Sequence, residues 1–409
     1  MAQELTYALI TPYSLSKSRT GGIISRLLTL ADNLDLVAAR MYAPSNAFVD
    51  RYAATFEKMD MDPLLKRTFV DYVNENLRPR AANPAGNRCP VLFLRGENAI
   101  RTLKENAVGS AVVDPTGDTV RGAYGDFILD AGGEAVKYFE PAVLVATDPR
   151  TNAEHLRLFA EFAKSDGGVL EHVVKFPRGV KPETTLVILK PDNFMRRSAR
   201  PGNIVDMFSR TGLRIVGIRV IYMSVAQGEE FYAPLVDVFR TRLRSAVTEK
   251  IRKGLTSVLD FPIDDATYEK MTDMLAEKNA LGEFHKIVEY MTGIDPSSVT
   301  NPADKKKPGK VQCLAILYRG ENAVAKIRER LGATDPGKAA AATVRSSFGY
   351  DLMKNAAHAS DSVESAERER RIVGLLGDEE PLVLHLIREY LSEQETAAFG
   401  GREQGSSRE

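Results

Sequence analysis

The sequence predicts an α+β protein in which one small domain occurs twice, with a helical insertion in the second copy. Short apolar stretches of strand length alternate with amphipathic stretches of helix length. In addition, residues 94–100 (LRGENAI) recur as residues 318–324 (YRGENAV), and the two cysteines, Cys89 and Cys313, each lie six residues before the arginine of that motif. A long repeat of this kind indicates two copies of one domain rather than a solenoid of short units.

The first copy begins with a strand at residues 7–12 (YALITP), which matches residues 186–191 of the second copy. Residues 22–30 predict an amphipathic helix, because their apolar side chains group on one face. Residues 141–148 predict a last strand. Residues 152–162 then predict a closing helix, which ends where a serine, an aspartate and two glycines interrupt the pattern.

The second copy follows a linker whose last part is residues 177–183. Its first strand, residues 185–189, delivers Lys190 at its C-terminal end, where a proline stops the ladder. Residues 204–208 begin a helix, and residues 213–220 alternate as a strand with polar side chains on one face. The resulting order, βαββαβ, is that of a ferredoxin-like sandwich, whose antiparallel sheet is covered by helices on one side.

The spacing between the copies locates the insertion. Tyr52 precedes its counterpart Tyr232 by 180 residues, whereas Cys89 precedes Cys313 by 224, so the second copy has 44 additional residues between these points. The cysteines are best explained as matched buried strand positions rather than as a disulfide or a metal pair.

The inserted region, about 240–282, contains an amphipathic helix rich in arginine and lysine at residues 239–253 and a second helical stretch around 268–275. One interpretation is a lid over a ligand or a docking surface for an anionic partner. The other is a solvated helical hairpin. Beyond the second copy, residues 381–391 predict an amphipathic helix that we expect to pack across both copies.

These observations give a complete domain plan. The predicted segments are a first copy at 1–165, a linker at 166–183, a second copy at 184–376, a C-terminal helix at 377–398 and a disordered tail at 399–409.

One histidine carries the strongest chemical signal. His358 lies between Asn355 and the pair Ser360-Asp361, and an acidic helical run follows it. An imidazole nitrogen attacks a terminal phosphate readily if a neighbour fixes its ring and tautomer, and Glu369, eleven residues on, is a candidate for that neighbour. Taken alone, such a histidine is more often a half-buried residue at the end of a strand.

The surrounding cationic and hydroxyl side chains favour the chemical interpretation. One lysine, two arginines and one threonine make a polyphosphate cradle. They are Lys190, Arg328, Arg345 and Thr334.

These residues resemble the nucleoside diphosphate kinase family, collinearly from Thr184 to about Val373. The resemblance implies a ferredoxin-like kinase domain that transfers a terminal phosphate by a ping-pong reaction through His358. It assigns Ser360 and Glu369 to support of that histidine. It implies phosphate contacts from Lys190, Tyr232, Arg328, Thr334 and Arg345, a sugar contact from Asn355, and base walls from Leu352 and Phe284.

The same resemblance implies the cofactor and marks the departures from the family. Mg²⁺ would be carried by the phosphates of ATP or another nucleoside triphosphate, with no metal ligand from the protein. The family's usual glycine after the histidine is Ala359, its Gly-Asp pair is Ser346-Ser347, and its Pro-Gly pair is Ala341-Ala342. An alternative function is therefore a catalytically weak nucleotide-binding sensor.

The first copy has lost the chemistry in this interpretation. Thr11, Val113 and Val145 stand where the lysine, the threonine and the histidine are expected. Arg121 and Tyr52 are retained, which leaves a residual anion or nucleotide site open. We expect a structural role instead, in which the two copies form an intramolecular pseudo-dimer; a further homo-oligomer stays open.

Composition limits the other classes of function. The 55 basic and 55 acidic residues among 409 cancel, so there is no strong nucleic-acid signal. No apolar run approaches the length that spans a membrane, and the first strand begins too early to leave room for a signal peptide. The expected location is the cytoplasm, and the expected partners are nucleoside di- and triphosphates.

Overall fold

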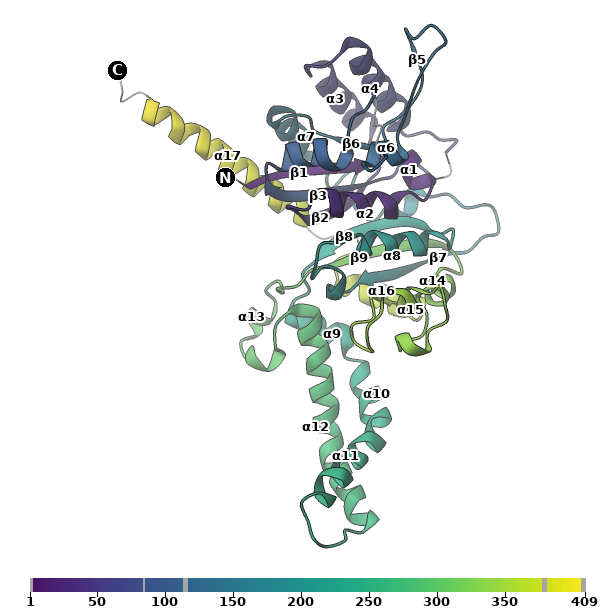
Figure 1. Ribbon diagram of the computed structural model, residues 1–409, viewed down its shortest axis with the longest axis vertical. Coiled ribbons are helices and arrows are strands. Elements are labelled where there is room, and N and C mark those ends of the chain that lie inside the picture. The colour runs from purple at the N-terminus through teal and green to yellow at the C-terminus, as the bar shows by residue number, and fades with distance from the viewer. Residues whose placement is uncertain (1–2, 84, 113–116, 377–380, 406–409) are drawn as a thin grey trace. The chain divides into compact units, whose positions relative to one another are not determined.

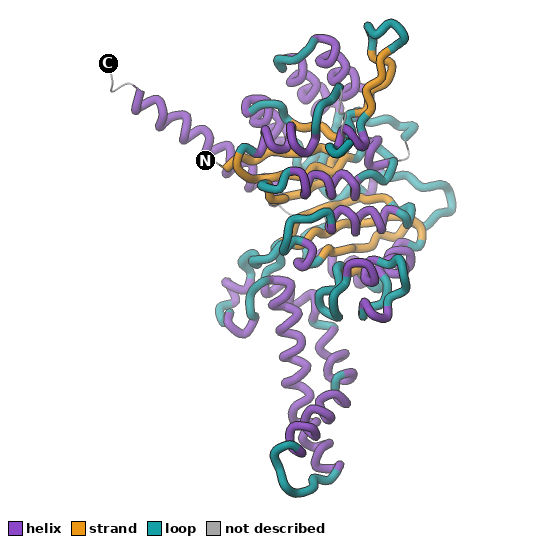
Figure 2. The backbone as a smooth tube through the Cα atoms, viewed as in Figure 1, coloured by secondary structure: helices purple, strands orange, loops and turns teal. Residues whose placement is uncertain are grey.

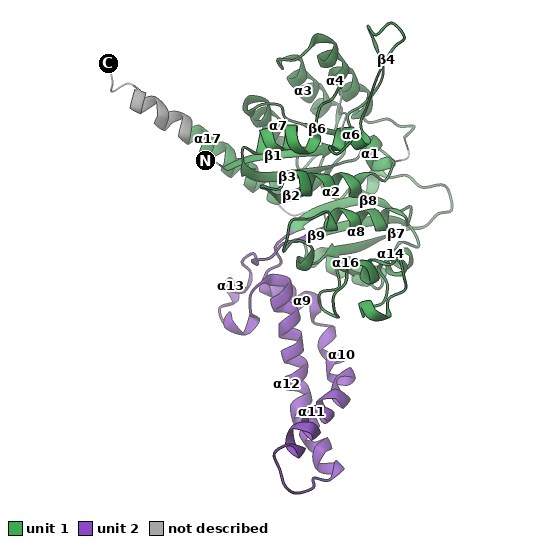
Figure 3. Ribbon diagram, viewed as in Figure 1, with its two compact units in different colours: residues 1–220, 314–409 green, residues 221–313 purple. Residues whose placement is uncertain are grey.

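The computed structural model describes residues 3–83, 85–112, 117–376 and 381–405, with the backbone alone for 397–405. The chain divides into two compact units, which are residues 1–220 with 314–409, and residues 221–313 (Figure 3). The first unit contains both predicted copies of the sandwich. The second unit is helical.

The first copy is built on a four-stranded antiparallel sheet in the order β2-β3-β1-β6 (Figures 1 and 2). Its strands are β1 (Gln3–Ile10), β2 (Leu34–Tyr42), β3 (Cys89–Glu97) and β6 (Val143–Val145), and β4 (Asp126–Leu129) and β5 (Val136–Glu140) form a separate hairpin. Its helices are α1 (Pro12–Ser16), α2 (Thr20–Leu30), α3 (Asn46–Glu57), α4 (Pro63–Asn76), α5 (Ala99–Thr102) continued by a π-helical turn (Leu103–Val108), α6 (Val120–Tyr124) and α7 (Pro149–Glu161).

The second copy repeats this arrangement with the strand order β8-β9-β7-β10. Its strands are β7 (Pro182–Leu189), β8 (Arg214–Ile221), β9 (Cys313–Glu321) and β10 (Ala357–Ala359). Its helices are α8 (Arg200–Ser209), α14 (Ala323–Leu331), α15 (Val344–Phe348) and α16 (Val363–Ile372), with short 3₁₀ turns at Pro191–Asn193 and Pro336–Lys338. The predicted βαββαβ order is confirmed in both copies.

Backbone conformation matches between the copies in detail. The asparagine that ends each repeated motif is left-handed, with φ of 50° at Asn98 and 54° at Asn322. The first residue of β3 and of β9 is a fully buried free cysteine, as the sequence predicts. Each motif therefore performs the same turn from strand to helix.

Both faces of the central strands are buried, whereas the sequence predicts helices on one side only. In β1, all residues from Leu5 to Ile10 are buried, and β7 is buried throughout from Thr184 to Leu189. In the first copy, the side chains of Leu5, Tyr7 and Leu9 join a core with apolar residues of α3, α4 and α7. The alternate residues of the strand face the opposite side, where α2 and α5 pack. Because α2 and α5 are the two helices of the minimal order, the additional cover comes from α3 and α4, which lie between β2 and β3, and from α7, which follows β6.

The C-terminal helix α17 (Leu382–Gly405) packs against α7, β1 and β2 of the first copy. Val383, Leu384, Ile387 and Tyr390 join the first-copy core. The expectation that the helix packs across both copies is therefore wrong for most of its length. The helix also continues past the predicted limit at residue 398, and residues 377–380 and 406–409 lie outside the described residues.

The two copies meet where α2 and α8 cross. Gly21 and Gly202 allow the close approach, since a Cβ on Gly202 would lie 2.3 Å from the carbonyl oxygen of Gly21. Ser25 Oγ bonds Ala199 O and Asn203 Oδ1, both at 3.0 Å, across the crossing. The linker also joins the two sheets, because Gly168 N donates to Met41 O of β2 at 2.9 Å and Leu170 N to Val216 O of β8 at 2.8 Å.

The helical unit contains α9 (Val225–Tyr232), α10 (Leu235–Arg242), α11 (Arg244–Thr256), α12 (Asp265–Thr292), α13 (Pro302–Lys305) and a 3₁₀ turn at Pro296–Ser298. The basic run predicted from the sequence is paired inside this unit. Arg244 of α11 bonds Glu269 of α12 at 2.7 Å, and Arg252 bonds Asp265 at 2.6 Å. These exposed ion pairs favour the solvated-hairpin interpretation over a docking surface for an anion.

Among the described residues, we find no helix whose length and apolar character would let it span a membrane.

Candidate active site

His358 is held by a buried carboxylate. β10 carries His358, and α16 carries Glu369, whose Oε2 lies 2.8 Å from His358 Nε2. Ser360 Oγ donates to the same carboxylate oxygen at 2.7 Å. The Glu369 side chain is 6% exposed and the histidine side chain 22%. A carboxylate accepts hydrogen bonds, so Nε2 carries the proton and the lone pair lies on Nδ1.

A strained turn places this histidine. Ala356 has a φ of +69°, and Ala357 N donates to Asn355 O at 2.8 Å across it, which is the rarer form of the γ-turn. The carbonyl of Ala356 accepts from Lys190 N at 3.0 Å and from Asn193 Nδ2 at 2.6 Å. The turn thus joins the end of β7 to the start of β10 and directs the side chains on either side of it.

Lys190 and Asn355 lie directly against each other. Lys190 Nζ donates to Asn355 Oδ1 at 2.7 Å and to Met353 O at 3.0 Å. Asn355 is buried, and its Nδ2 donates to the carbonyls of Thr334 and Leu352, both at 3.0 Å. The side-chain amide of Asn355 therefore connects Lys190, the loop that contains Thr334 and the loop that contains Leu352.

The side chain of Arg345 connects the loop that contains Gly332 and Thr334 with the start of β10. Its Nη1 donates to Gly332 O at 3.1 Å and lies 3.5 Å from Thr334 Oγ1, and its Nη2 donates to Ala357 O at 3.2 Å. The arginine follows Thr343, which caps α15 through a reciprocal pair of bonds with Ser346. Ser346, which stands where the resemblance implies a glycine, therefore has a structural partner.

Arg328 lies exposed in the last turn of α14. Its charge acts on Asp361, whose pKa is held below its ordinary value, first by a hydrogen bond from Ser365 and further by Arg328 and His358. Asp361 is therefore a charged neighbour of the histidine, although the sequence analysis gave it no role.

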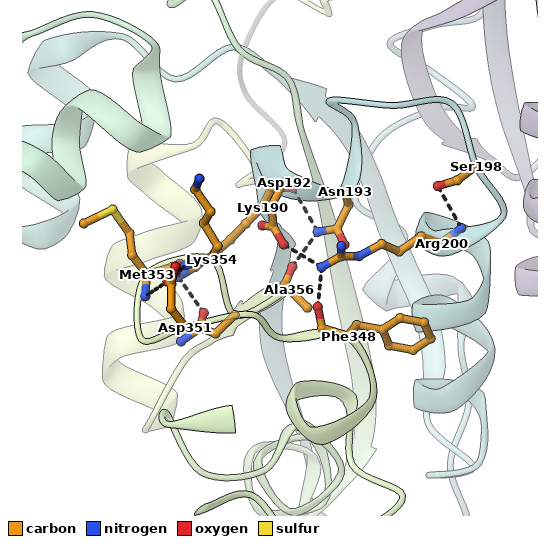
Figure 4. A network of polar contacts seen from close by, with 11 residues as sticks. Lys190, Asp192, Asn193, Ser198, Arg200, Phe348, Asp351, Met353, Lys354 and Ala356 are labelled. Atoms are coloured by element: carbon orange, nitrogen blue, oxygen red, sulfur yellow. Dashed lines mark hydrogen bonds and ion pairs between the residues drawn. The ribbon is translucent and has the colours of Figure 1, made fainter. Parts of the chain in front are cut away.

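A second set of residues connects the segment after Lys190 with the loop before Ala356 (Figure 4). Arg200 bonds Asp192 Oδ2 at 2.7 Å, donates to Phe348 O, and lies 4.8 Å from the ring centroid of Tyr350. Asp351 Oδ1 accepts from Met353 N at 2.7 Å and from Lys354 N at 2.6 Å, which closes a tight turn with Leu352 at its exposed tip. The sequence analysis missed these residues, although Asp192 lies only two positions after Lys190.

Two predicted site residues, Tyr232 and Phe284, belong to the helical unit. Tyr232 ends α9 and is 6% exposed, and Phe284 lies in α12 and is 7% exposed. The other nine predicted residues belong to the first unit, on α14, α15, β10, α16 and the loops next to them, with Lys190 directly after β7. In the described part of the chain, no group of three or more His, Cys, Asp or Glu side chains is arranged to hold a metal ion.

Comparison with known proteins bears on this cluster. The family model described as nucleoside diphosphate kinase matches residues 183–241 and 236–374. A protein named nucleoside diphosphate kinase from Bdellovibrio bacteriovorus is 33% identical over 187 residues, which are 46% of this chain and 89% of that protein. The chain belongs to the nucleoside diphosphate kinase family.

Other members of the nucleoside diphosphate kinase family are similarly close. One from Anaeromyxobacter dehalogenans is 32% identical over 46% of this chain and 85% of its own length. One from Chlamydia muridarum is 29% identical over 45% of this chain and 86% of its own. A crystal structure of the Aquifex aeolicus nucleoside diphosphate kinase covers 47% of this chain and 95% of its own, at 26% identity and a TM-score of 0.30. The family model falls on the second copy, which contains His358.

The first copy presents different side chains at the equivalent points. His358 pairs with Ile188 of β7, and Leu9, the equivalent residue of β1, pairs with Leu144. The counterpart of His358 is therefore Leu144 and not Val145, because β6 is in register one residue earlier than the sequence predicts. Val113 lies outside the described residues. Leucine, like valine, offers no atom that can accept a phosphoryl group.

A carboxylate occupies the region beside the first copy's lysine position. Thr11, which stands at that position, donates to Glu140 Oε1 at 2.8 Å, and Tyr72 donates to Oε2 at 2.7 Å. Glu140 is 3% exposed, and burial raises its pKa. The buried Glu140 side chain, an acidic group beside Thr11, opposes the binding of a phosphate at this position.

The counterpart of Glu369 is also changed. His155 lies in α7 at the equivalent position, fully buried, with Nδ1 2.7 Å from Tyr7 Oη and Nε2 2.5 Å from Thr55 Oγ1. Tyr7 Oη also lies 2.8 Å from Tyr52 Oη, so the retained Tyr52 belongs to the core. Burial lowers the pKa of His155 to about 3. The histidine therefore stays neutral within a closed polar network.

Proposed function

We propose that this protein is a nucleoside diphosphate kinase whose second copy transfers the terminal phosphate of a nucleoside triphosphate to a nucleoside diphosphate through His358. The pairing of His358 Nε2 with Glu369 at 2.8 Å is the observation that carries the proposal. This pairing leaves the Nδ1 lone pair as the nucleophile. Ser360 supports it by holding the same carboxylate oxygen.

The reaction has two balanced halves. Nδ1 attacks the terminal phosphorus, a P–N bond forms, the P–O bond to the leaving diphosphate breaks, and the nucleoside diphosphate departs. The positive charge that develops on the ring is stabilised by the Glu369 carboxylate through Nε2–H. A second nucleoside diphosphate then attacks the phosphohistidine with its terminal oxygen, which breaks the P–N bond and regenerates His358.

The cationic side chains are assigned to the phosphates. Lys190, Arg328 and Arg345 neutralise the charge that spreads over the transferred group, with Thr334 beside them. Tyr232 contributes a further phosphate contact in this proposal, Asn355 holds the sugar, and Leu352 and Phe284 form the base walls. The substrate would be the Mg²⁺ complex of ATP or another nucleoside triphosphate, in which the ion would neutralise part of the phosphate charge.

The first copy has a structural role in this proposal. It pairs with the second copy as an intramolecular pseudo-dimer, at the high effective concentration that a single chain provides. The close crossing of α2 and α8 at Gly21 and Gly202 supports this pairing. The first proposed domain keeps the predicted limits at 1–165, and the second, predicted at 184–376, begins at Pro182 with β7. The cytoplasmic location stays a prediction from composition.

Labelling with [γ-³²P]ATP tests the nucleophile. The full chain is expected to form a phosphoenzyme that is labile in acid and stable in base, and His358→Asn is expected to abolish it. His385→Asn, at an exposed histidine of α17, serves as the matched control and should label like the wild type. Label retained by His358→Asn would refute the assignment.

The second candidate, a nucleotide-binding sensor with weak catalysis, is favoured by one observation. Ala342 has a φ of +60° where the family has glycine, so the loop before Arg345 is strained. A coupled assay of phosphate exchange between ATP and a second nucleoside diphosphate separates the two. Binding without turnover would favour the sensor.

A further inference from the structure

A groove between the two copies lies apart from His358. Its volume is about 350 Å³, within the range of small-molecule sites. The end of α1 and the start of α2 line one side, and the end of α8 and the start of β8 line the other. Both copies of the domain therefore contribute to its walls.

The lining is cationic and rich in hydroxyl groups. Arg88 and Arg214 line the groove with Ser16, Ser18, Thr20 and Ser209, and no aspartate or glutamate is among its described lining residues. Two guanidinium groups in one groove repel each other, and an anion between them relieves that repulsion. Arg214 also contacts the linker, since its Nη1 donates to Lys175 O at 3.1 Å and its guanidinium group lies 5.2 Å from the ring centroid of Phe176. The composition of the walls therefore favours an anionic occupant.

Arg88 is a buried residue in the wall of the groove. It is 4% exposed, its Nε donates to Ala85 O at 2.8 Å, and its Nη1 donates to Ile215 O of the other copy. Among the described residues, no carboxylate forms an ion pair with it. Burial, and then the charge of Arg214, lowers the pKa of Arg88 to about 10. A buried cation held only by carbonyl groups is unfavourable until an anion joins it.

Two further features of the walls are a buried hydroxyl group without a partner and a strained backbone conformation. Thr20 is 3% exposed, and its hydroxyl has no hydrogen-bond partner among the described residues. Ser18, on the turn before α2, has a φ of +58°, a strained value for a residue with a Cβ. Buried hydroxyl groups are normally paired, and strain of this kind gathers at ligand sites.

We infer that this groove binds a small phosphorylated metabolite, with the guanidinium groups of Arg88 and Arg214 on its phosphate. Arginine suits this ligand because its planar donors match two phosphate oxygens at once. Leu15, Val205 and Leu213 provide an apolar wall for the remainder of the molecule. Because both copies contribute, binding stabilises their pairing. This site is separate from the proposed kinase reaction.

Equilibrium dialysis of the full chain with [³²P]pyrophosphate tests the inference. The wild type is expected to bind two equivalents, one at the kinase cluster and one in the groove. Arg214→Gln is expected to weaken the groove equivalent by at least about tenfold, because it removes charge-assisted hydrogen bonds to the phosphate. Arg345→Gln should weaken the other equivalent. Arg210→Gln, at an exposed arginine at the end of α8, is the matched control and should keep both.

A second variant and a second readout keep the test decisive. Arg88→Lys retains the charge but loses the planar donors, and is expected to weaken the same equivalent as Arg214→Gln. Pyrophosphate is expected to raise the melting temperature of Arg345→Gln but not that of the Arg214→Gln, Arg345→Gln double variant. If Arg214→Gln binds like Arg210→Gln, so that the wild type has no equivalent that Arg214→Gln weakens, the inference is refuted; loss of only the equivalent that depends on Arg345 would count against the kinase cluster and not against the groove.

Discussion

Replacing Glu369 with glutamine tests the core of the proposed mechanism with the smallest change of shape. The carboxylate accepts from both His358 Nε2 at 2.8 Å and Ser360 Oγ at 2.7 Å, and its side chain is 6% exposed. A glutamine has the same volume but no charge to stabilise the developing imidazolium. If its amide nitrogen turns toward Nε2, the proton moves to Nδ1 and the nucleophilic lone pair is lost.

The expected loss follows from these contacts. A hydrogen bond to a charged group contributes roughly 1.5–3 kcal/mol, which corresponds to roughly a tenfold to a hundredfold fall in the rate of phosphoenzyme formation. The rate is measured by rapid quench with [γ-³²P]ATP. Glu367→Gln, an exposed glutamate on the same helix, is the matched control and should be nearly unchanged. A Glu369→Gln rate within about threefold of the control would contradict the proposed role.

Three other variants test the stability of the fold rather than the chemistry of His358. Gly202→Ala should destabilise the chain by roughly 1–3 kcal/mol in urea unfolding, because its Cβ would lie 2.3 Å from Gly21 O, whereas Gly254→Ala, with open space in α11, should be neutral or stabilising. Ala342→Gly should raise stability by about 1 kcal/mol, since φ is +60° there; a lower melting temperature would contradict the strain. His155 has a folded pKa of about 3 against an ordinary value of 6.5, so between these pH values the unfolded chain binds a proton that the folded chain does not. Stability should therefore fall by about 1.4 kcal/mol per pH unit as the pH drops through this window, and His155→Gln should flatten that slope; an unchanged slope would refute it.

Much of the fold could be predicted from local patterns. Alternation and helical periodicity each span only a few residues, so they identify strands such as β7 and helices such as α2 without knowledge of what packs on them. The repeated Arg-Gly-Glu-Asn motif predicted two copies with equivalent buried cysteines, and both copies have the same strand order. The association of His358 with Glu369 was foreseeable because both lie within eleven residues on adjacent elements.

The errors concern features that depend on residues far apart in the chain. The register of β6, a three-residue strand, is set by its pairing with β1, so Leu144 rather than Val145 is the counterpart of the histidine. The second helical cover of the sheets and the docking of α17 on the first copy depend on which apolar faces meet in the folded chain.

The sequence by itself determined the family, the duplicated sandwich and the candidate nucleophile, because each is encoded in short patterns and in the spacing of particular side chains. Tertiary structure alone decided how those side chains are used. The folded chain brings together Lys190 and Asn355, Thr11 and Glu140, and Arg88 and the carbonyl group of Ile215, each as a hydrogen-bonded pair. The two residues of each pair are more than 100 positions apart in the sequence. A contact between residues that far apart forms only when the intervening chain has folded.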